Sequence, residues 1–146
     1  MVRTVNDSLT IANRLRPALL RLARELRREI HSLGVSGSQV SLLAAIDHNP
    51  GISASELAER EGMSAPGISG HLVRLEGAKL IARERTTDRR RIGLTLTGEG
   101  RRVLRSVRSR RTAWLAARLN GLTAKEREAV DAALEPLEKL LEADEA

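Results

Sequence analysis

Apolar residues near the N-terminus recur every three or four positions, which is the spacing of one face of an α-helix. The residues that form this stripe are Ile11, Leu15, Leu19, Leu22, Leu26 and Ile30. Ser8 precedes the stripe and can cap its first turn, and Gly34 ends the segment. Pro17 lies inside the stripe and cannot donate a backbone hydrogen bond, so we expect a kink or a break there.

Two short helices are predicted next, on either side of a turn. The first runs from about Ser38 to Asp47, and Asn49-Pro50-Gly51 marks the turn. Ser53-Ala54-Ser55-Glu56 has the form of a capping box, in which the Ser and the Glu each bond to the backbone of the other. This box opens the second helix, and Gly62 ends it.

A further helix begins after Ser64, whose hydroxyl group can cap the first turn. Pro66 is tolerated in that turn because no backbone donor is needed there. Three residues at helical spacing form its inward face: Ile68, Leu72 and Leu75. Its outward face is small or polar and allows another surface to approach closely; it comprises Ser64, Ala65, Gly67, Ser69, Gly70, His71 and Arg74.

The spacing of the apolar residues then changes from the period of a helix to the period of a strand. Residues 80–85 and 91–96 are predicted strands, and Ile92, Leu94 and Leu96 share one face at period two. A short polar loop, Thr86-Thr87-Asp88-Arg89-Arg90, joins them into a hairpin.

Two helices complete the chain. Thr97 can cap a long helix that Gly121 closes, and Thr123-Ala124-Lys125-Glu126 is a second capping box. Residues 98–120 hold seven Arg and one Glu, a net charge of +6, whereas residues 121–146 hold three basic and eight acidic residues, a net charge of −5. The last helix carries a wide apolar face of Leu134, Leu137, Leu140 and Leu141, which fits burial in a dimer better than a monomer core.

Composition narrows the function. The 146 residues fit one compact unit, complete by itself or as an oligomer. The 25 basic and 19 acidic residues give a net charge of +6 and a pI near 11.1. All basic residues except three Lys are Arg, which can bind phosphates and guanines through two hydrogen bonds, although a G+C-rich genome would also favour Arg.

The residue types that are absent exclude several classes of site and of function. Without Cys there is no disulfide, thiolate zinc site, Cys nucleophile or Cys redox sensor. Without Phe and Tyr the chain cannot build an aromatic platform for single-stranded nucleic acid, so a basic protein of this kind favours duplex DNA. We expect no metal site or cofactor, because His31, His48 and His71 lie apart with no carboxylate at ligand spacing. The longest uncharged stretch, residues 30–46, is too short and polar to span a bilayer, so we expect a cytoplasmic protein.

Two short helices followed by a basic-tipped hairpin predict a winged helix-turn-helix, in a fold that is mainly α with a small β-hairpin wing. A helix fits the major groove, where each base pair shows a distinct pattern of donors and acceptors. Arg89, Arg90 and Arg91 at the hairpin are long enough to reach a neighbouring minor groove. We expect Asp88 to pair with one of these arginines and hold its direction.

The motifs of this region agree with a known family. They are Pro50-Gly51-Ile52-Ser53, Glu56-Leu57-Ala58, Ser64-Ala65-Pro66-Gly67-Ile68-Ser69, Leu75-Glu76, Leu80-Ile81-Ala82-Arg83, Asp88-Arg89-Arg90, Leu96-Thr97 and Gly100. Together they resemble the MarR family of bacterial transcriptional regulators. The order of helices is similar over the whole chain, and residues 50–100 carry the diagnostic motifs.

The resemblance implies a homodimer, held by N- and C-terminal dimerisation helices at 1–33 and 98–146, with a DNA-binding lobe at 36–97. It implies a repressor of a palindromic operator that a small aromatic or lipophilic anion releases, although the residues of a ligand pocket are not identified. By resemblance, Arg90 is the wing arginine of the minor groove, Asp88 steadies it, and positions 64–74, Pro66 included, form the recognition helix.

Three positions depart from the family pattern. Gly70 replaces the usual Arg, so His71 or Arg74 would have to supply that contact. Lys79 replaces the usual Gly at the end of the recognition helix, where a left-handed backbone would be strained, and Gly77 could take the turn earlier instead. Arg91 replaces a small or polar residue and should add affinity for phosphate.

Other interpretations remain open from the sequence. A sequence-tolerant architectural DNA-binding protein is the alternative function, and an enzyme is disfavoured because no catalytic constellation appears. The arginines between Arg101 and Arg111 could form a solvated helix face, contact DNA or face a ligand. Trp114 fits a core or interface anchor better than a ligand stacker.

Overall fold

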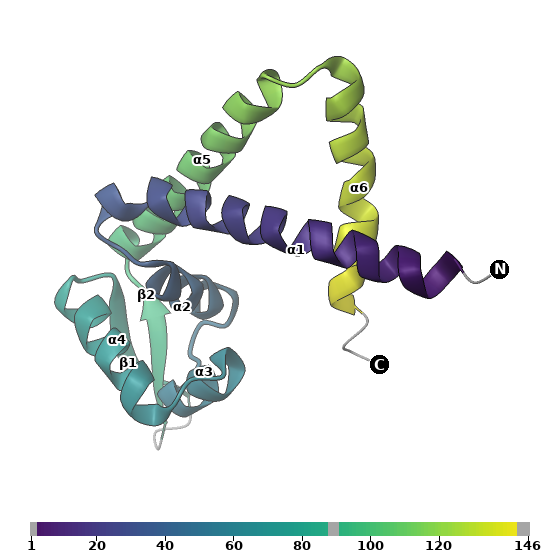
Figure 1. Ribbon diagram of the computed structural model, residues 1–146. Helices are drawn as coiled ribbons and strands as arrows, with labels where there is room; N and C mark the ends of the chain where they lie inside the picture. The colour runs from purple at the N-terminus through teal and green to yellow at the C-terminus, as the bar shows by residue number, and fades with distance from the viewer. Residues whose placement is uncertain (1–2, 88–90, 143–146) are drawn as a thin grey trace. The chain divides into compact units, whose positions relative to one another are not determined.

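The computed structural model describes residues 3–87 and 91–142, and it is mainly α with one two-stranded antiparallel hairpin (Figure 1). The predicted fold class is confirmed. The elements in chain order are α1 (Arg3–Glu29), the 3₁₀-helix η1 (His31–Leu33), α2 (Gly37–His48), α3 (Ala54–Glu61), α4 (Ala65–Gly77), β1 (Ile81–Arg85), β2 (Ile92–Leu96), α5 (Gly98–Asn120) and α6 (Ala124–Glu142). The chain divides into two compact units, one up to Arg111 and one from Thr112 onward.

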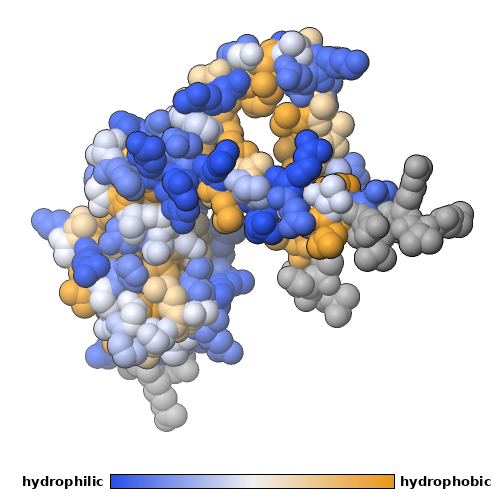
Figure 2. Space-filling view, viewed as in Figure 1, coloured by the Kyte–Doolittle hydropathy of each residue, from blue (hydrophilic) through white to orange (hydrophobic). Residues whose placement is uncertain are grey.

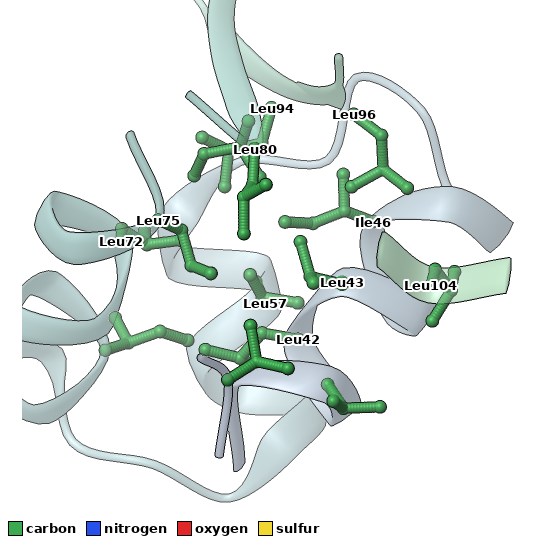
Figure 3. Close-up of a cluster of buried hydrophobic side chains, with 14 of the residues drawn as sticks. Leu42, Leu43, Ile46, Leu57, Leu72, Leu75, Leu80, Leu94, Leu96 and Leu104 are labelled. Atoms are coloured by element: carbon green, nitrogen blue, oxygen red, sulfur yellow. The ribbon is translucent and has the colours of Figure 1, made fainter. Parts of the chain in front are cut away.

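The hydrophobic core lies in the first unit, where α2, α3, α4 and the hairpin meet the first half of α5. Figure 3 shows its leucines pointing toward one another from these separate elements. The side chains with less than 2% exposure are Ile30, Leu42, Leu43, Ile46, Leu57, Leu72, Leu75, Leu94 and Val107. On the predicted inward face of α4, Leu72 and Leu75 belong to this set, and Ile68 is 2% exposed. Each such side chain contributes about 1.5–3 kcal/mol on burial.

The hairpin is also tied to the turn between α2 and α3. Ile81 pairs with Leu96 and Arg85 with Ile92. Gly51 N donates to Leu94 O at 2.9 Å, and Leu94 N donates to Ile52 O at 2.8 Å. These two bonds form an isolated antiparallel bridge between Ile52 and Leu94, which fixes the hairpin on the turn between α2 and α3.

One predicted strand face is only partly right. Leu94 and Leu96 are buried, but Ile92 is 55% exposed. Ile92 pairs with the exposed Arg85 at the loop end of the hairpin, beyond the reach of the core.

One prediction about α1 is wrong, and one of the two alternatives for Pro17 is excluded. The helix begins at Arg3, so Ser8 lies inside it and does not cap it, because the residues before Ser8 are also helical. The helix continues through Pro17, so Pro17 does not break it, and the kink stays a prediction. A proline removes one hydrogen bond, here the one to the carbonyl group of Asn13, and Asn13 is exposed so that water can replace it.

The other helix boundaries follow the predicted caps closely. Thr123 N donates to Glu126 Oε1 and Glu126 N to Thr123 Oγ1, so the second capping box is complete. In the first box Glu56 N donates to Ser53 Oγ at 3.2 Å, but the Glu56 carboxylate pairs with Arg91 instead of Ser53 N, so only half of that box forms.

The end of α4 shows how the chain replaces a missing glycine. Lys79 has a φ of 62°, the left-handed conformation expected for the family's glycine. The alternative that Gly77 takes the turn earlier is wrong, because Gly77 is the last residue of α4 and has no positive φ. Thr97 Oγ1 donates to Lys79 O at 2.6 Å, which holds the strained turn against the start of α5.

The second unit consists of the end of α5 and α6. Arg127 Nη1 donates to the carbonyl oxygens of Leu119 and Leu122 and closes the corner between the helices. The guanidinium group of Arg118 lies 5.1 Å from the centre of the Trp114 ring. None of the described residues of α6 is fully buried. Across the described ranges, no helix combines the length and hydropathy that crossing a membrane requires.

Candidate nucleic-acid interface

Helix α4 presents the predicted small and polar face to the outside. Ser64 accepts a hydrogen bond from Gly67 N at 3.2 Å, so its hydroxyl group caps the helix as expected. The exposed residues of this face are Ser64, Ala65, Pro66, Gly67, Ser69, Gly70 and Arg74. A Cβ atom added at Gly70 would meet nothing within 4 Å, so this position lies on open surface.

His71 differs from the rest of this face. Its side chain is half-buried, and Nδ1 is enclosed without a hydrogen-bond partner. Nε2 is then the ring nitrogen that remains for an outside partner. His71 can therefore offer one polar atom at this surface, not two.

The geometry between α3 and α4 is a tight turn. Gly62 has a φ of 62° and ends α3, and Met63 N donates to Ala58 O at 2.9 Å. Because Leu57 on α3 and Leu72 on α4 are both fully buried, the core holds the inner side of α4 in place. The exposed face of α4 is thus carried on a rigid support.

The hairpin supplies the second part of the surface. Asp88, Arg89 and Arg90 lie outside the described residues, so the predicted pairing of Asp88 is not observed. Arg91 directly follows them and forms an ion pair with Glu56 of α3. Thr86 donates to Arg91 O from both N and Oγ1, at 3.1 and 3.2 Å, which closes the base of the loop.

The Arg91–Glu56 pair is a feature that sequence analysis missed. Both residues were noticed, Arg91 as a phosphate contact and Glu56 as part of a capping box. Their 35-residue separation hides the contact, and the bridge between Ile52 and Leu94 brings the start of α3 close to β2.

The sequence did not identify the residues that line a hollow of about 560 Å³, except that Arg111 belongs to the arginines that could face a ligand. This hollow lies within the first unit, and its lining residues are Ala23, Leu26, Arg27, Gly37, Ser38, Ser41 and Arg111. Arg111 Nε is buried and has no hydrogen-bond partner. The hollow therefore combines an apolar wall with positive charge. No cluster of potential metal ligands occurs within 3–87 and 91–142.

Comparisons with known proteins agree with this architecture. The model of the MarR family matches residues 33–92. The repressor MdtR of Bacillus subtilis is 35% identical over 103 residues, which are 70% of this chain and 66% of the repressor, about two thirds of its length.

Solved structures show the same fold over nearly the whole chain. A Pseudomonas aeruginosa protein is 34% identical with a TM-score of 0.78, and the match covers 93% of this chain and 96% of that one. A mutant of MepR from Staphylococcus aureus, bound to an oligodeoxyribonucleotide, is 21% identical with a TM-score of 0.70 over 90% of this chain and 97% of MepR. The family match, the relatives and the hairpin-bearing helical fold together show that the chain belongs to the MarR family of transcriptional regulators.

Proposed function

We propose that the protein is a homodimeric repressor that reads a palindromic DNA operator in the cytoplasm and leaves it when a small lipophilic or aromatic anion binds. The observation that carries this proposal is the exposed, small and polar face of α4 on a buried support. MepR, whose fold is similar, is known bound to an oligodeoxyribonucleotide. As a member of a family of DNA-binding regulators, the chain is a regulator and not an enzyme.

The proposed DNA contacts come from two elements. The residues are Ser64, Ala65, Pro66, Gly67, Ser69, Gly70, His71 and Arg74 at α4, with Asp88, Arg89 and Arg90 at the hairpin, whose base Arg91 holds through its ion pair with Glu56. Residues 36–97 form the proposed DNA-binding lobe.

Exposed apolar side chains support the homodimer. Figure 2 shows apolar residues gathered along α5 and α6. Within the second unit they line a hollow of about 580 Å³ whose walls include Leu115, Leu119, Val130 and Leu134. On α1, Leu9 and Ile11 are each 61% exposed. A second copy that covers these faces of residues 1–33 and 98–146 would remove them from water.

The hollow at Arg111 supports the proposal that a small anion releases the protein from DNA. Its apolar wall of Ala23 and Leu26 suits a lipophilic body, and Arg27 and Arg111 suit a carboxylate. An anion that bonds to Arg111 Nε would give this buried donor a partner.

The test is DNA binding by a matched pair of glycine variants. Gly70→Glu places a negative side chain on the proposed DNA face, and Gly98→Glu adds the same charge at another exposed glycine. Neither added Cβ atom meets another atom within 4 Å, so both variants should fold. We expect Gly70→Glu to lose binding at least a hundredfold to DNA upstream of the protein's own gene, and Gly98→Glu to bind within about threefold of wild type.

Equal losses in both variants would contradict the role of α4. The same assay separates the architectural alternative, since a preference for that DNA over random DNA below about tenfold would favour it. Salicylate serves as the probe anion, and we expect it to weaken DNA binding by the wild type but not by Arg111→Gln.

A further inference from the structure

The structure divides the six arginines between Arg101 and Arg111 of α5 into two groups. Those of the first group are used elsewhere. Arg101 donates to Leu96 O at 3.1 Å, Arg108 lies 3.9 Å from Asp47, and Arg111 lines the hollow described above.

The second group gathers at a separate hollow. This hollow of about 390 Å³, the α5 arginine hollow, is lined by Arg102, Arg105, Ser106, Ser109, Arg110 and Leu33. The five residues from α5 are spaced at i, i+3, i+4, i+7 and i+8, so they share one helix face. All of them belong to the first compact unit.

Among the residues that the structure describes, carboxylates balance only part of the positive charge in the α5 arginine hollow. Arg102 has a carboxylate partner, Glu99, at 2.6 Å. Arg110 donates to the uncharged hydroxyl group of Ser32 at 2.5 Å. The side chain of Arg105 has neither an ion pair nor a hydrogen bond with any residue that the structure describes.

The bond between Arg110 and Ser32 also orients the site. It joins residues 78 positions apart and holds the Arg110 side chain toward η1, beside Leu33. One guanidinium group of the hollow is thereby fixed before any ligand arrives, which lowers the entropy cost of binding.

We propose that the α5 arginine hollow binds a small phosphorylated anion. Guanidinium groups match the several oxygen atoms of a phosphate through paired hydrogen bonds, and the hydroxyl groups of Ser106 and Ser109 add donors. The volume is in the range of small-molecule sites. Leu33 is the single apolar residue among those that line this hollow, and the hydroxyl groups of Ser106 and Ser109 lie beside its guanidinium groups.

The first test is calorimetric titration of the DNA-free protein with sodium pyrophosphate at constant ionic strength. We expect binding to wild type, a loss of at least tenfold in Arg105→Gln and a smaller loss in Ser109→Ala. Arg85→Gln is the matched control, because Arg85 is also exposed but lies on β1, outside the hollow. An equal loss in Arg85→Gln, or no binding to wild type at millimolar pyrophosphate, would overturn the proposal.

The second test separates a free phosphorylated anion from the phosphates of DNA. The salt dependence of DNA binding should be the same for wild type and Arg105→Gln. A slope of log K against log salt that falls by about 0.9 in Arg105→Gln would assign the hollow to the DNA backbone and overturn the proposal. Since the titration uses no DNA, its result does not depend on the proposed function.

Discussion

The ion pair between Arg91 and Glu56 leads to a prediction that decides how the hairpin takes part in DNA binding. Arg91 could bind a DNA phosphate, as the sequence suggests, or it could hold the base of the hairpin on α3. The perturbations are Arg91→Gln, Glu56→Gln, the double variant, and the exchange of the two charges. Gln keeps the length of Glu and removes its charge, and Glu56 N can still donate to Ser53 in every variant.

The size of the effect follows from the exposure of the pair. The two side chains are 42% and 49% exposed, so the pair is screened by water and should stabilise the fold by no more than about 1 kcal/mol. Each single variant should therefore cost at most that amount, and the double variant should cost little more than either one. Urea denaturation measures these free energies of unfolding.

DNA binding at several salt concentrations then separates the two roles. If Arg91 holds the hairpin, Arg91→Gln and Glu56→Gln should weaken DNA binding to a similar extent, with an unchanged salt slope, and the charge exchange should restore most of the affinity. If Arg91 binds a phosphate, the slope should fall by about 0.9 in Arg91→Gln alone. We expect the first pattern. The second pattern would refute the role of Arg91 in holding the hairpin on α3.

Three further predictions concern the fold. Gly100→Ala should destabilise the protein by about 1–3 kcal/mol in urea denaturation, because its Cβ atom would lie 2.0 Å from the backbone oxygen of Leu80; an unchanged urea midpoint would contradict that close approach. Lys79→Gly should raise the thermal midpoint, with a gain of up to about 1 kcal/mol, because glycine adopts a φ of 62° without strain; a lower midpoint would show that strain is not the main cost there. The N–H and hydroxyl groups of Thr123 lower the pKa of Glu126 below its ordinary value of 4.5, so its contribution to stability is present above pH 4.5 and is lost as the pH falls through the lowered pKa. Glu126→Gln should remove that part of the pH dependence of the urea midpoint, and an unchanged profile would count against this cap.

Local signals explain why so much of the fold could be predicted from the sequence. A cap such as Ser64 or Thr97 acts within three residues, so the residue type and its spacing are sufficient to place the start of a helix. The left-handed turn at Lys79 is a different case, because the sequence also allowed the turn at Gly77 and only the position of the family's glycine indicated residue 79.

The errors occur where distant parts of the chain decide the outcome. Period two places Ile92 on the same face as Leu94, but burial depends on how far the core extends beneath the hairpin. The competing uses of Glu56 likewise depend on the position of Arg91, which sequence spacing cannot supply. The same holds for the arginines of α5, which are equivalent in the sequence and differ only through Asp47, Ser32 and other partners.

The apolar faces of the terminal helices are the opposite case. Their spacing is clear in the sequence, but the surface that would cover them is not part of the same chain. Leu9 on α1 and Leu141 on α6 remain 61% and 79% exposed, although both belong to helices with a regular apolar spacing. At about 25 cal/mol for each Å² of apolar surface, leaving such faces in water forgoes several kcal/mol for each helix. The apolar periodicity shows that a helix face is to be covered, but it does not show which surface covers it. A second copy is the partner that brings a matching apolar face with it, which is why the dimer is part of the proposed function rather than an addition to it.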